Sequence, residues 1–253
     1  MRQPLSAVII TLNAAHQLEP CLQSIVFADE IIVVDSGSSD GTVELAQRYG
    51  ARVIHQDWLG FGRQKQFAVA QASHDWVLCI DSDERIGKEL KTAIETVLQI
   101  PTARIYRMAR SNKFMGRFLR HGEGYPDWSP RLFDRRHANW SDDPVHEKVI
   151  SQEPIGTLQG DMLHESGEDV FVYLQKQNRY TSLQAEQLFE RGKRANTGKL
   201  LLSPLFRFIR FYFFRLGLLD GLPGLVHILI GCFNSFCKYA KLLELQRTGK
   251  HKS

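Results

Sequence analysis

Cysteine is scarce in this sequence, and its copies are widely separated. The 253 residues include four cysteines, and no two of them form a CxxC pair. This spacing argues against a zinc site or a disulfide scaffold and is typical of proteins in a reducing cytoplasm. Because the first apolar segment starts within a few residues of Met1, we also expect no signal peptide.

Two common phosphate-binding signatures are absent as well. A dinucleotide-binding protein would carry GxGxxG after its first strand, but the sequence at 11–16 reads TLNAAH. No GxxxxGK[ST] motif of the P-loop type occurs either. A phosphate-bearing ligand would therefore have to be held by a metal ion and basic side chains. The formal net charge of +4 is modest, and we expect no nucleic-acid partner.

What the sequence does contain is a regular alternation of short apolar runs and helical patterns. With 43% hydrophobic and 24% charged residues, the composition is that of a globular protein. Four strands alternating with three helices predict an α/β fold with a right-handed, mostly parallel, doubly wound sheet. The predicted strands are 6–12, 30–34, 51–55 and 76–80, and the predicted helices are 16–25, 43–49 and one that starts near 63.

The second half of the chain has a less regular pattern. A surface helix is predicted at 88–100 and a long helix at 169–191, with strands at 104–109, 131–134 and 145–150. Residues 111–127 are aromatic, contain glycine and are mixed in charge, which is more typical of a binding loop than of a packed element.

The stretch 76–85, WVLCIDSDER, joins an apolar run to a cluster of acids. Ligand sites of open α/β sheets gather beyond the carboxyl ends of such strands. Asp81 and Asp83 could hold Mg²⁺ or Mn²⁺ there, because these hard cations prefer carboxylate oxygens. Alternatively, Asp83 only opens the helix that follows, as acids near helix N-termini often do.

A second acid, Asp35, ends the second predicted strand. It could pair with a nucleobase or a ribose, and residues 36–40 offer small side chains and backbone amides. Alternatively, Asp40 only caps the helix that begins at Thr42.

Three motifs in this order resemble those of the inverting family 2 glycosyltransferases of GT-A fold: TLN at 11–13, VVDSGSSDGT at 33–42 and DSDE at 81–84. The resemblance spans about residues 5–245 and is strongest to bacterial lipopolysaccharide core β-1,4-glucosyltransferases. It implies a GT-A, Rossmann-like sheet and a UDP-sugar donor, with the uracil at Asp35, the ribose near Asp81 and the metal on Asp83. The other implied donor-site residues are Thr11, Leu12, Asn13, Ser36, Gly37, Asp40, Gln64, Lys65 and Ser82.

An inverting transfer also needs a carboxylate that takes the proton from the attacking hydroxyl. We assign this role to Glu147, because VHE at 145–147 resembles a motif of this branch; otherwise it is a solvent-facing strand residue. Many family members carry a Glu-Asp (ED) pair at the position that corresponds to this motif, and this chain does not carry one there. The other candidates are Glu123, Asp127, Asp142 and Asp143.

Two more side chains are candidates for the diphosphate end of the donor. His164 resembles a distal histidine that some GT-A enzymes add to the metal or the diphosphate, although a lone histidine is often only structural. Arg131 could meet a phosphate of the donor or the acceptor, although surface arginines are usually only solvated.

The C-terminal part is both basic and apolar. Residues 199–219 interleave aromatic side chains with Arg207, Arg210 and Arg215, the pattern of a helix that lies in a membrane interface. The apolar run 225–237 is shorter than the roughly 20 residues that a spanning helix needs. Alternatively, these helices pack on the sheet or on a partner subunit. Residues 220–224 are predicted to form the turn between them.

Together these patterns lead to one expected organisation and function. We expect a GT-A domain at 1–190, with a nucleotide-binding half at about 1–100 and an acceptor half at about 101–190, and a membrane-associating amphipathic helical tail at 191–253. The enzyme would move a hexose, with glucose favoured, from a UDP-sugar to a heptose of the lipopolysaccharide inner core, on the cytoplasmic face of the bacterial inner membrane. The alternatives are a polyprenyl-phosphate or other cell-envelope glycosyltransferase and a non-catalytic nucleotide-sugar-binding membrane adaptor.

Overall fold

The computed structural model describes residues 2–143, 147–167 and 169–249. The chain forms two compact units: the first comprises residues 1–111 and 127–165, and the second comprises 112–126 and 166–253. This division differs from the expected boundary at residue 190, because helix α5 (Val170–Glu190) packs against the C-terminal helix α7 (Gly221–Thr248). Ala185 of α5 is buried with Leu242 and Leu245 of α7, so α5 belongs to the second unit.

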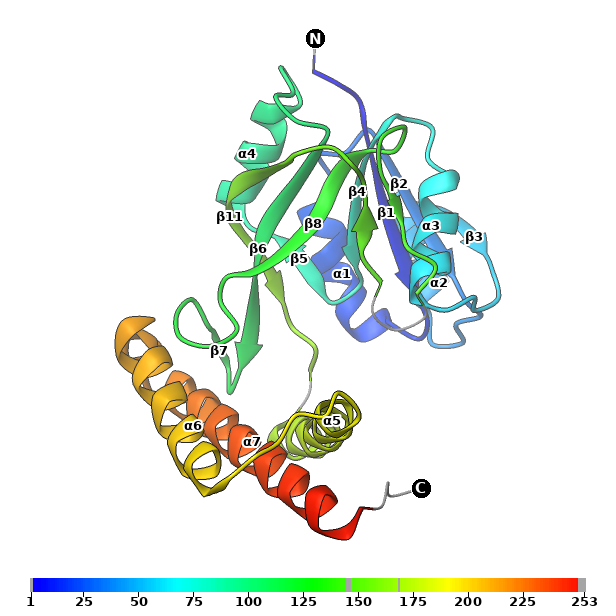
Figure 1. Ribbon diagram of the computed structural model, residues 1–253. Helices are drawn as coiled ribbons and strands as arrows, with labels where there is room; N and C mark the ends of the chain where they lie inside the picture. Colours follow the sequence, from blue (N-terminus) through cyan, green and yellow to red (C-terminus); the bar gives the residue numbers. More distant parts are fainter. Residues whose placement is uncertain (1, 144–146, 168, 250–253) are drawn as a thin grey trace. The chain divides into compact units, whose positions relative to one another are not determined.

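The first part of the chain has the predicted alternation of strands and helices (Figure 1). Strands β3 (Arg52–His55), β2 (Glu30–Asp35), β1 (Leu5–Thr11) and β4 (Trp76–Asp81) are parallel neighbours in that order. Helices α1 (Ala15–Ser24), α2 (Thr42–Arg48) and α3 (Phe61–Ala70) connect them. Nearly every residue of β1, β2 and β4 is buried, which explains why these strands read as continuous apolar runs.

The rest of the sheet is largely antiparallel, and several of its strands were not predicted. Beyond β4 follow β8 (Asp127–Asp134), β6 (Ile105–Phe114), β11 (Ile155–His164) and β5 (Glu84–Ile86), and β7 (Arg117–Phe118) pairs with β6. The three-residue β5 means that Asp83 does not open a helix, since α4 (Lys88–Val97) starts later. The polar β11 has no long apolar run that would have predicted it.

The strand predicted at 145–150 is much shorter than expected. Only Val149–Ile150 forms a strand, β10, which pairs with β9 (Asn139–Trp140). Residues 145 and 146 of the VHE motif lie outside the described residues. Glu147 precedes β10 and is therefore not a strand residue.

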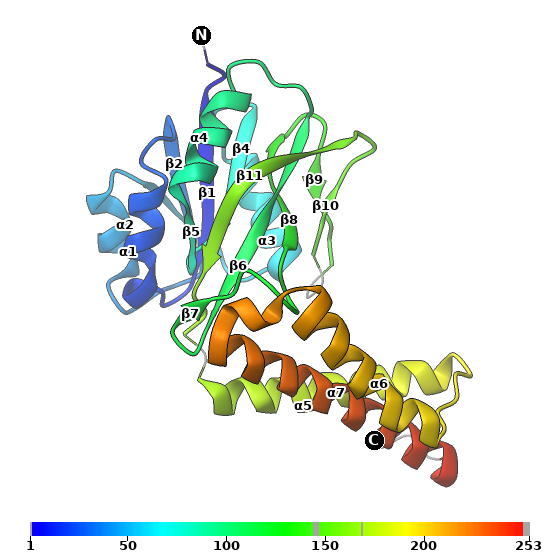
Figure 2. The same cartoon turned by 90° about the vertical axis from the view of Figure 1, so that its left-hand side faces the viewer.

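Helices cover both faces of the sheet. Figure 2 shows α1, α2 and α4 on one side, where Leu18, Leu22 and Ile94 pack on the sheet. On the other side, Ala68 and Val69 of α3 pack against the sheet together with Trp140. The register pairs Thr11 with Asp35 and Ile10 with Asp81 across neighbouring strands, so the two acids lie at one edge.

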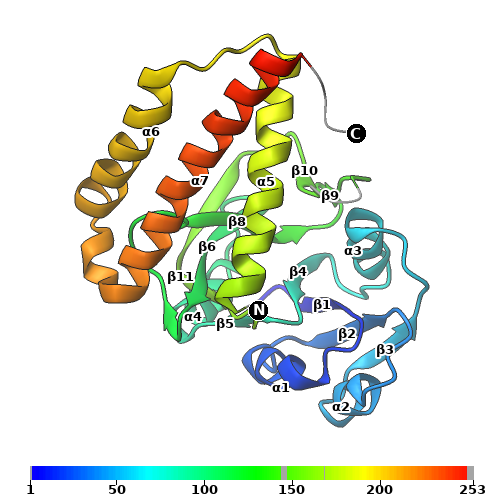
Figure 3. The same ribbon diagram turned by 90° about the horizontal axis from the view of Figure 1, so that it is seen from below.

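In the second unit, α7 lies between α5 and α6 (Thr197–Ile209), as Figure 3 shows. A π-helical turn, Arg210–Phe214, and a 3-10 turn, Gly217–Asp220, connect α6 to α7. The chain therefore reverses before residue 220, not at 220–224 as predicted. Pro223 is accommodated in the first turn of α7, where a missing backbone N–H leaves no helical bond unmade.

The tail differs from its prediction in two further respects. Residues 217–248 form a helical segment that is long and apolar enough to cross a membrane by length and composition, although a third of its apolar window is buried. Arg207 is not free to face lipid, because its guanidinium pairs with the carboxylate of Glu123. Arg210 and Arg215 are exposed.

Candidate active site

A rigid carboxylate stands at the end of β2. The Asp35 side chain accepts hydrogen bonds from the Thr11 hydroxyl at 2.9 Å, from the Gly37 amide at 2.9 Å and from the Ser38 amide at 2.7 Å. Burial raises the pKa of Asp35, but the hydrogen bonds from Ser38 and its neighbours outweigh burial and hold that pKa below its usual range. Asp35 is therefore a fixed, ionised acceptor at the edge of the sheet.

The turn after Asp35 is held by side chains that the motifs had singled out. Asn13 Oδ1 accepts from the Ser39 amide at 2.9 Å. Gln64 is fully buried, and its Nε2 donates to the Ser36 hydroxyl at 3.0 Å. Asp40 accepts from the amide of Thr42, the first residue of α2, although the N-cap position itself is Gly41.

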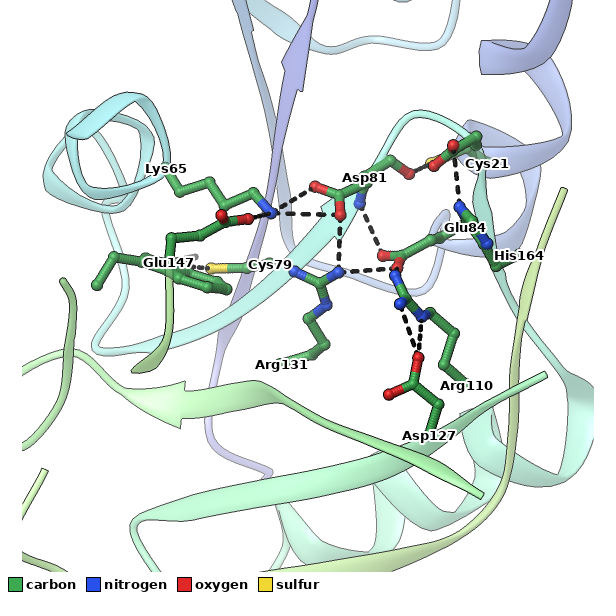
Figure 4. Close-up of polar contacts among 12 residues, drawn as sticks. Cys21, Lys65, Cys79, Asp81, Glu84, Arg110, Asp127, Arg131, Glu147 and His164 are labelled. Atoms are coloured by element: carbon green, nitrogen blue, oxygen red, sulfur yellow. Dashed lines mark hydrogen bonds and ion pairs between the residues drawn. The ribbon is translucent and has the colours of Figure 1, made fainter. Parts of the chain in front are cut away.

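Three elements bring acids and cations together beside Asp81 (Figure 4). From α3, Lys65 Nζ lies 3.0 Å from Asp81 Oδ1, and from β8, Arg131 Nη2 lies 2.7 Å from Asp81 Oδ2. Arg131 also donates to Glu84 at 2.8 Å. Burial alone would raise the pKa of Asp81, but the charges of Arg131 and then Lys65 hold it well below its usual range. Asp81 is thus kept as an anion by two cations in a partly buried site.

The same lysine links Asp81 to Glu147. Lys65 Nζ lies 2.9 Å from Glu147 Oε1, and the two side chains are 7% and 16% exposed. Gly62 makes this approach possible: a Cβ atom there would lie 2.0 Å from the backbone oxygen of Ser141. Only glycine lets the segment that leads to Glu147 pass so close to α3.

The other candidate bases do not share this position. Asp127 pairs with Arg110 at 2.7 Å, and Asp142 is 82% exposed and lies 3.9 Å from Arg63. Asp143 is exposed, and Glu123 belongs to the second unit. Asp127 reaches the charge network of Asp81 only through Arg110 and Glu84, whereas Glu147 shares the cation Lys65 with Asp81 directly.

Asp83, in the turn before β5, and His164, at the end of β11, meet at the edge of the sheet. His164 Nε2 lies 3.1 Å from Asp83 Oδ2, because the register of β11 and β5 places His164 opposite Glu84. A carboxylate oxygen and an imidazole nitrogen at this spacing fit a divalent cation that takes its remaining ligands from a diphosphate. Among the described residues, no group of three or more potential metal ligands occurs.

A cavity of about 300 Å³ opens beside Glu147 in the first unit. Trp140 forms part of its wall and carries two cations over its ring, with Lys65 Nζ 4.9 Å and Arg131 Cζ 5.7 Å from the ring centroid. Trp128 is 41% exposed at the same cavity. Trp140 itself is buried, so Trp128 supplies the exposed aromatic surface beside Glu147 that could contact a sugar ring.

Residues 6–157 match the family model described as glycosyl transferase family 2. The chain belongs to this family. Over 263 residues the glycosyltransferase is 33% identical to the lipopolysaccharide core biosynthesis glycosyltransferase LpsC of Rhizobium meliloti, covering 95% of this chain and 92% of LpsC. Over 261 residues it is 31% identical to an uncharacterized glycosyltransferase of Rickettsia bellii, covering 97% and 88% of the two chains.

A solved structure agrees on the fold. The Staphylococcus aureus TarS structure in complex with UDP-GlcNAc aligns with 99% of this glycosyltransferase and 93% of the TarS chain, at a TM-score of 0.51 and 15% identity. Together with the family match, this similarity establishes the GT-A fold predicted from the motifs.

Sequence reasoning missed several residues of this glycosyltransferase's site. Glu84 is fully buried and holds Arg131, yet within DSDE it had no assigned role. Its burial follows from β5, which the sequence did not predict. Trp128, in the strand that carries Arg131, and Trp140, in the next strand β9, were also missed. Ser82 and Leu12 lie near the site edge without a decisive contact: the Ser82 hydroxyl accepts from Gln17 at 3.3 Å, and Leu12 is exposed.

Proposed function

We propose that this glycosyltransferase is an inverting, metal-dependent enzyme that moves a hexose, with glucose favoured, from a UDP-sugar to a heptose of the lipopolysaccharide inner core. The observation that carries this proposal is the chain of contacts from Asp81 through Lys65 to Glu147, which sets a carboxylate beside the donor acids. The similarity to LpsC supports the lipopolysaccharide acceptor.

The donor lies along the carboxyl edge of the parallel strands in this proposal. Asp35 accepts the N–H of the uracil base, and Asp81 faces the ribose. Asp83 and His164 hold Mg²⁺ or Mn²⁺, which supplies charge neutralisation for the leaving diphosphate when it is bound. Lys65 and Arg131 add positive charge at the same place, but both are already paired with acids, so they position the site more than they bind phosphate.

The acceptor occupies the cavity lined by Trp128, Trp140 and Glu147. The exposed part of the Trp128 ring contacts the acceptor sugar, and Glu147 takes the proton of its attacking hydroxyl. Inversion requires this attack on the side of the donor sugar opposite the diphosphate. Lys65 holds the Glu147 carboxylate in one orientation while the acceptor enters.

We further propose that the second unit rests on the cytoplasmic face of the inner membrane. The exposed side chains Leu222, Leu229, Phe233 and Phe236 form one stripe of α7. The buried residues Gly231, Ser235 and Leu242 lie on the opposite side, where the helix packs on its neighbours. A helix with one packed and one apolar exposed side is suited to an interface, and the exposed Arg210 and Arg215 can meet anionic head groups.

Transfer with defined substrates tests the enzymatic part of the proposal. Purified protein is incubated with UDP-glucose, Mn²⁺ and a heptose-terminated core acceptor, and the product is analysed by mass spectrometry and by the anomeric coupling of the new linkage. We expect one added hexose in the β configuration and no product in EDTA. Transfer to a polyprenyl phosphate and not to the heptose acceptor would favour the alternative of a polyprenyl-phosphate glycosyltransferase. Binding of the UDP-sugar without transfer to either acceptor would favour the non-catalytic adaptor.

A further inference from the structure

The second unit contains a polar cavity of about 130 Å³ that the proposed reaction does not use. It lies among α5, α6, α7 and the loop that carries Glu123, and all of these segments belong to the second unit. Hydroxyls and side-chain amides line it together with two cations, Arg207 and Lys238, and one acid, Glu123. The wall is thus rich in hydrogen-bond donors and has one cation more than it has acids.

The acid of the wall is neutralised by the first of these cations. Arg207 Nε donates to Glu123 Oε2 at 2.9 Å, and Arg207 Nη2 donates to the other carboxylate oxygen. Gly231 allows this pair to sit against α7, since a Cβ atom there would lie 2.2 Å from Glu123 Oε2. A guanidinium has five N–H donors, so the two bonds to Glu123 do not exhaust those of Arg207.

Lys238 is the cation without an acid partner. Among the described residues no carboxylate pairs with its ammonium, which lies 4.8 Å from the centroid of the Tyr239 ring. Lys238 is half-buried, and an ammonium group has three donors. The positive charge of Lys238 therefore remains available to an anion in the cavity.

The wall also contains a histidine with an unused nitrogen. Within the part of the chain that the structure describes, the buried Nδ1 of His227 has no hydrogen-bond partner, and its Nε2 lies 3.1 Å from the Tyr173 hydroxyl. Burial, and then the charge of Arg207, lower the pKa of His227 to about 4, so the ring is neutral at neutral pH. When the Tyr173 hydroxyl donates to Nε2, the ring proton stands on Nδ1 as a donor that an anionic oxygen can satisfy.

The volume of the cavity selects a small anion. It corresponds to about four water molecules at roughly 30 Å³ each. A terminal phosphate group, with its four oxygen atoms, is of this size, whereas a sugar residue or a nucleotide is larger. Ammonium, guanidinium and amide N–H groups are the donors that bind phosphate oxygens in proteins.

We propose that this cavity binds a terminal phosphate group, with Lys238 and Arg207 as its charged partners and His227 as a neutral donor. Two sources can supply this group: a membrane lipid whose phosphate carries no further substituent, and free inorganic phosphate. The site itself does not depend on the sugar transfer. Its lipid source rests on the membrane contact of α7 in the proposed function.

The place of the cavity on α7 suits a lipid phosphate. His227, Gly231 and Asn234 line it and share one side of the helix, because they are spaced by four and three residues. That side is opposite the exposed apolar stripe that contains Phe233. A helix in a membrane interface buries its apolar side by roughly 5–10 Å, so its opposite side lies near the level of the head groups. Basic pockets between membrane-associated helices bind phosphate-bearing head groups in this way.

The variant Lys238→Met tests the site in the full-length protein. Methionine keeps an unbranched apolar chain and removes the charge, and the fold should persist because Lys238 is half-buried and has no ion pair within the described residues. The matched control is Lys193→Met, which removes the same charge from an exposed residue of the same unit outside the cavity. A third variant, Glu123→Gln, removes the carboxylate that opposes an anion. The first probe is inorganic phosphate, titrated by calorimetry in a phosphate-free buffer.

We expect Lys238→Met to raise the Kd of phosphate by about tenfold or more, because it removes a charge-assisted hydrogen bond. Lys193→Met should bind phosphate like the wild type. Glu123→Gln should lower the Kd, because it also releases donors of Arg207 to the ligand. No phosphate binding by the wild type, or equal Kd values in the wild type and Lys238→Met, would overturn the site.

Vesicles distinguish the two sources of the phosphate. They contain phosphatidic acid or, at matched surface charge, phosphatidylglycerol, whose phosphate carries a further glycerol. We expect the wild type and Lys193→Met to sediment preferentially with phosphatidic acid and Lys238→Met to lose this preference. Phosphate binding without the preference would support the site with free phosphate as its ligand and would overturn the lipid source. If the wild type binds no vesicles, the proposed membrane contact fails, and calorimetry with phosphate still decides the site.

Discussion

Replacement of Glu147 by glutamine tests the assigned base with the smallest change in shape. Glutamine keeps an oxygen that can accept from Lys65, but its amide cannot take a proton from the acceptor hydroxyl. A positioned general base contributes about 10²–10⁴-fold to the rate. At 1.36 kcal/mol per factor of ten, this corresponds to about 3–5 kcal/mol in the activation barrier.

The effect of the same change on stability is expected to be smaller. The 2.9 Å bond between Lys65 and Glu147 is charge-assisted, and such bonds contribute about 1.5–3 kcal/mol to folding. Glutamine keeps the bond and loses only its charge, so we expect a cost of about 1 kcal/mol. A domain stable by about 5–15 kcal/mol stays folded after such a loss. The fall in turnover can therefore not be assigned to unfolding.

The assay compares turnover, UDP binding and melting temperature of Glu147→Gln with those of Asp127→Asn and Asp143→Asn. We expect Glu147→Gln alone to lose turnover by the stated factor while it still binds UDP with Mn²⁺. Normal transfer by Glu147→Gln, together with an inactive Asp127→Asn or Asp143→Asn variant, would refute the assignment. Loss of UDP binding in Glu147→Gln would instead place this carboxylate in the donor site.

Three other perturbations address the metal, the charge network and the membrane. Asp83→Ala should lower the activity by orders of magnitude and should abolish the response to added Mn²⁺. Its melting temperature should change little, because the side chain lies in a turn. An active variant would contradict the metal site. Lys65→Met should lower the free energy of unfolding by about 3–5 kcal/mol at neutral pH, because it leaves two acids beside one another. The pKa of Asp81 is lower in the folded protein than in the unfolded chain, where it is about 4. The ionised Asp81 therefore stabilises the fold above about pH 4, and this stabilisation is lost as the pH falls through the folded-state pKa. The difference in unfolding free energy between Lys65→Met and the wild type should thus become smaller in acid, and a difference that does not change with pH would contradict this account. Phe233→Glu should weaken the sedimentation of the protein with anionic vesicles. The control Ile100→Glu, a change at an exposed residue of the first unit, should not. Equal vesicle binding by both variants would indicate that the exposed apolar side of α7 contacts another protein.

The parallel half of the fold was predictable because its strands are buried on both faces. A short continuous apolar run such as 76–80 is typical of a strand that is buried on both faces. An acid that ends such a run lies at the carboxyl edge of the sheet. Asp35 and Asp81 could therefore be placed at one edge before any contact was known. The antiparallel strands were less predictable, because β5 is short and β11 is polar, and pairing between distant segments forms them.

The boundary between the units depended on packing that local patterns do not record. The helix at 170–190 is amphipathic enough to cover a sheet or another helix, and its sequence does not choose between them. Contacts with the C-terminal helix place this helix in the second unit. For example, Lys241 donates to the backbone oxygen of Asn178 and to the hydroxyl of Thr181. The same packing pairs Arg207 with Glu123 and so removes one of the three arginines that were expected to face lipid.

The sequence by itself determined the family motifs, the four parallel strands and the edge at which Asp35 and Asp81 stand, because these follow from local periodicity and from the geometry of a parallel sheet. Only the tertiary structure decided which carboxylate joins those acids. Asp127, Asp142 and Glu147 are chemically alike and close in sequence, and the fold brings a different cation to each: Arg110, Arg63 and Lys65. Glu147 meets Lys65, 82 residues away in sequence, because Gly62 lets its segment pass against α3. Contacts at that separation depend on how the layers pack, and a pattern read along the chain carries no information about them.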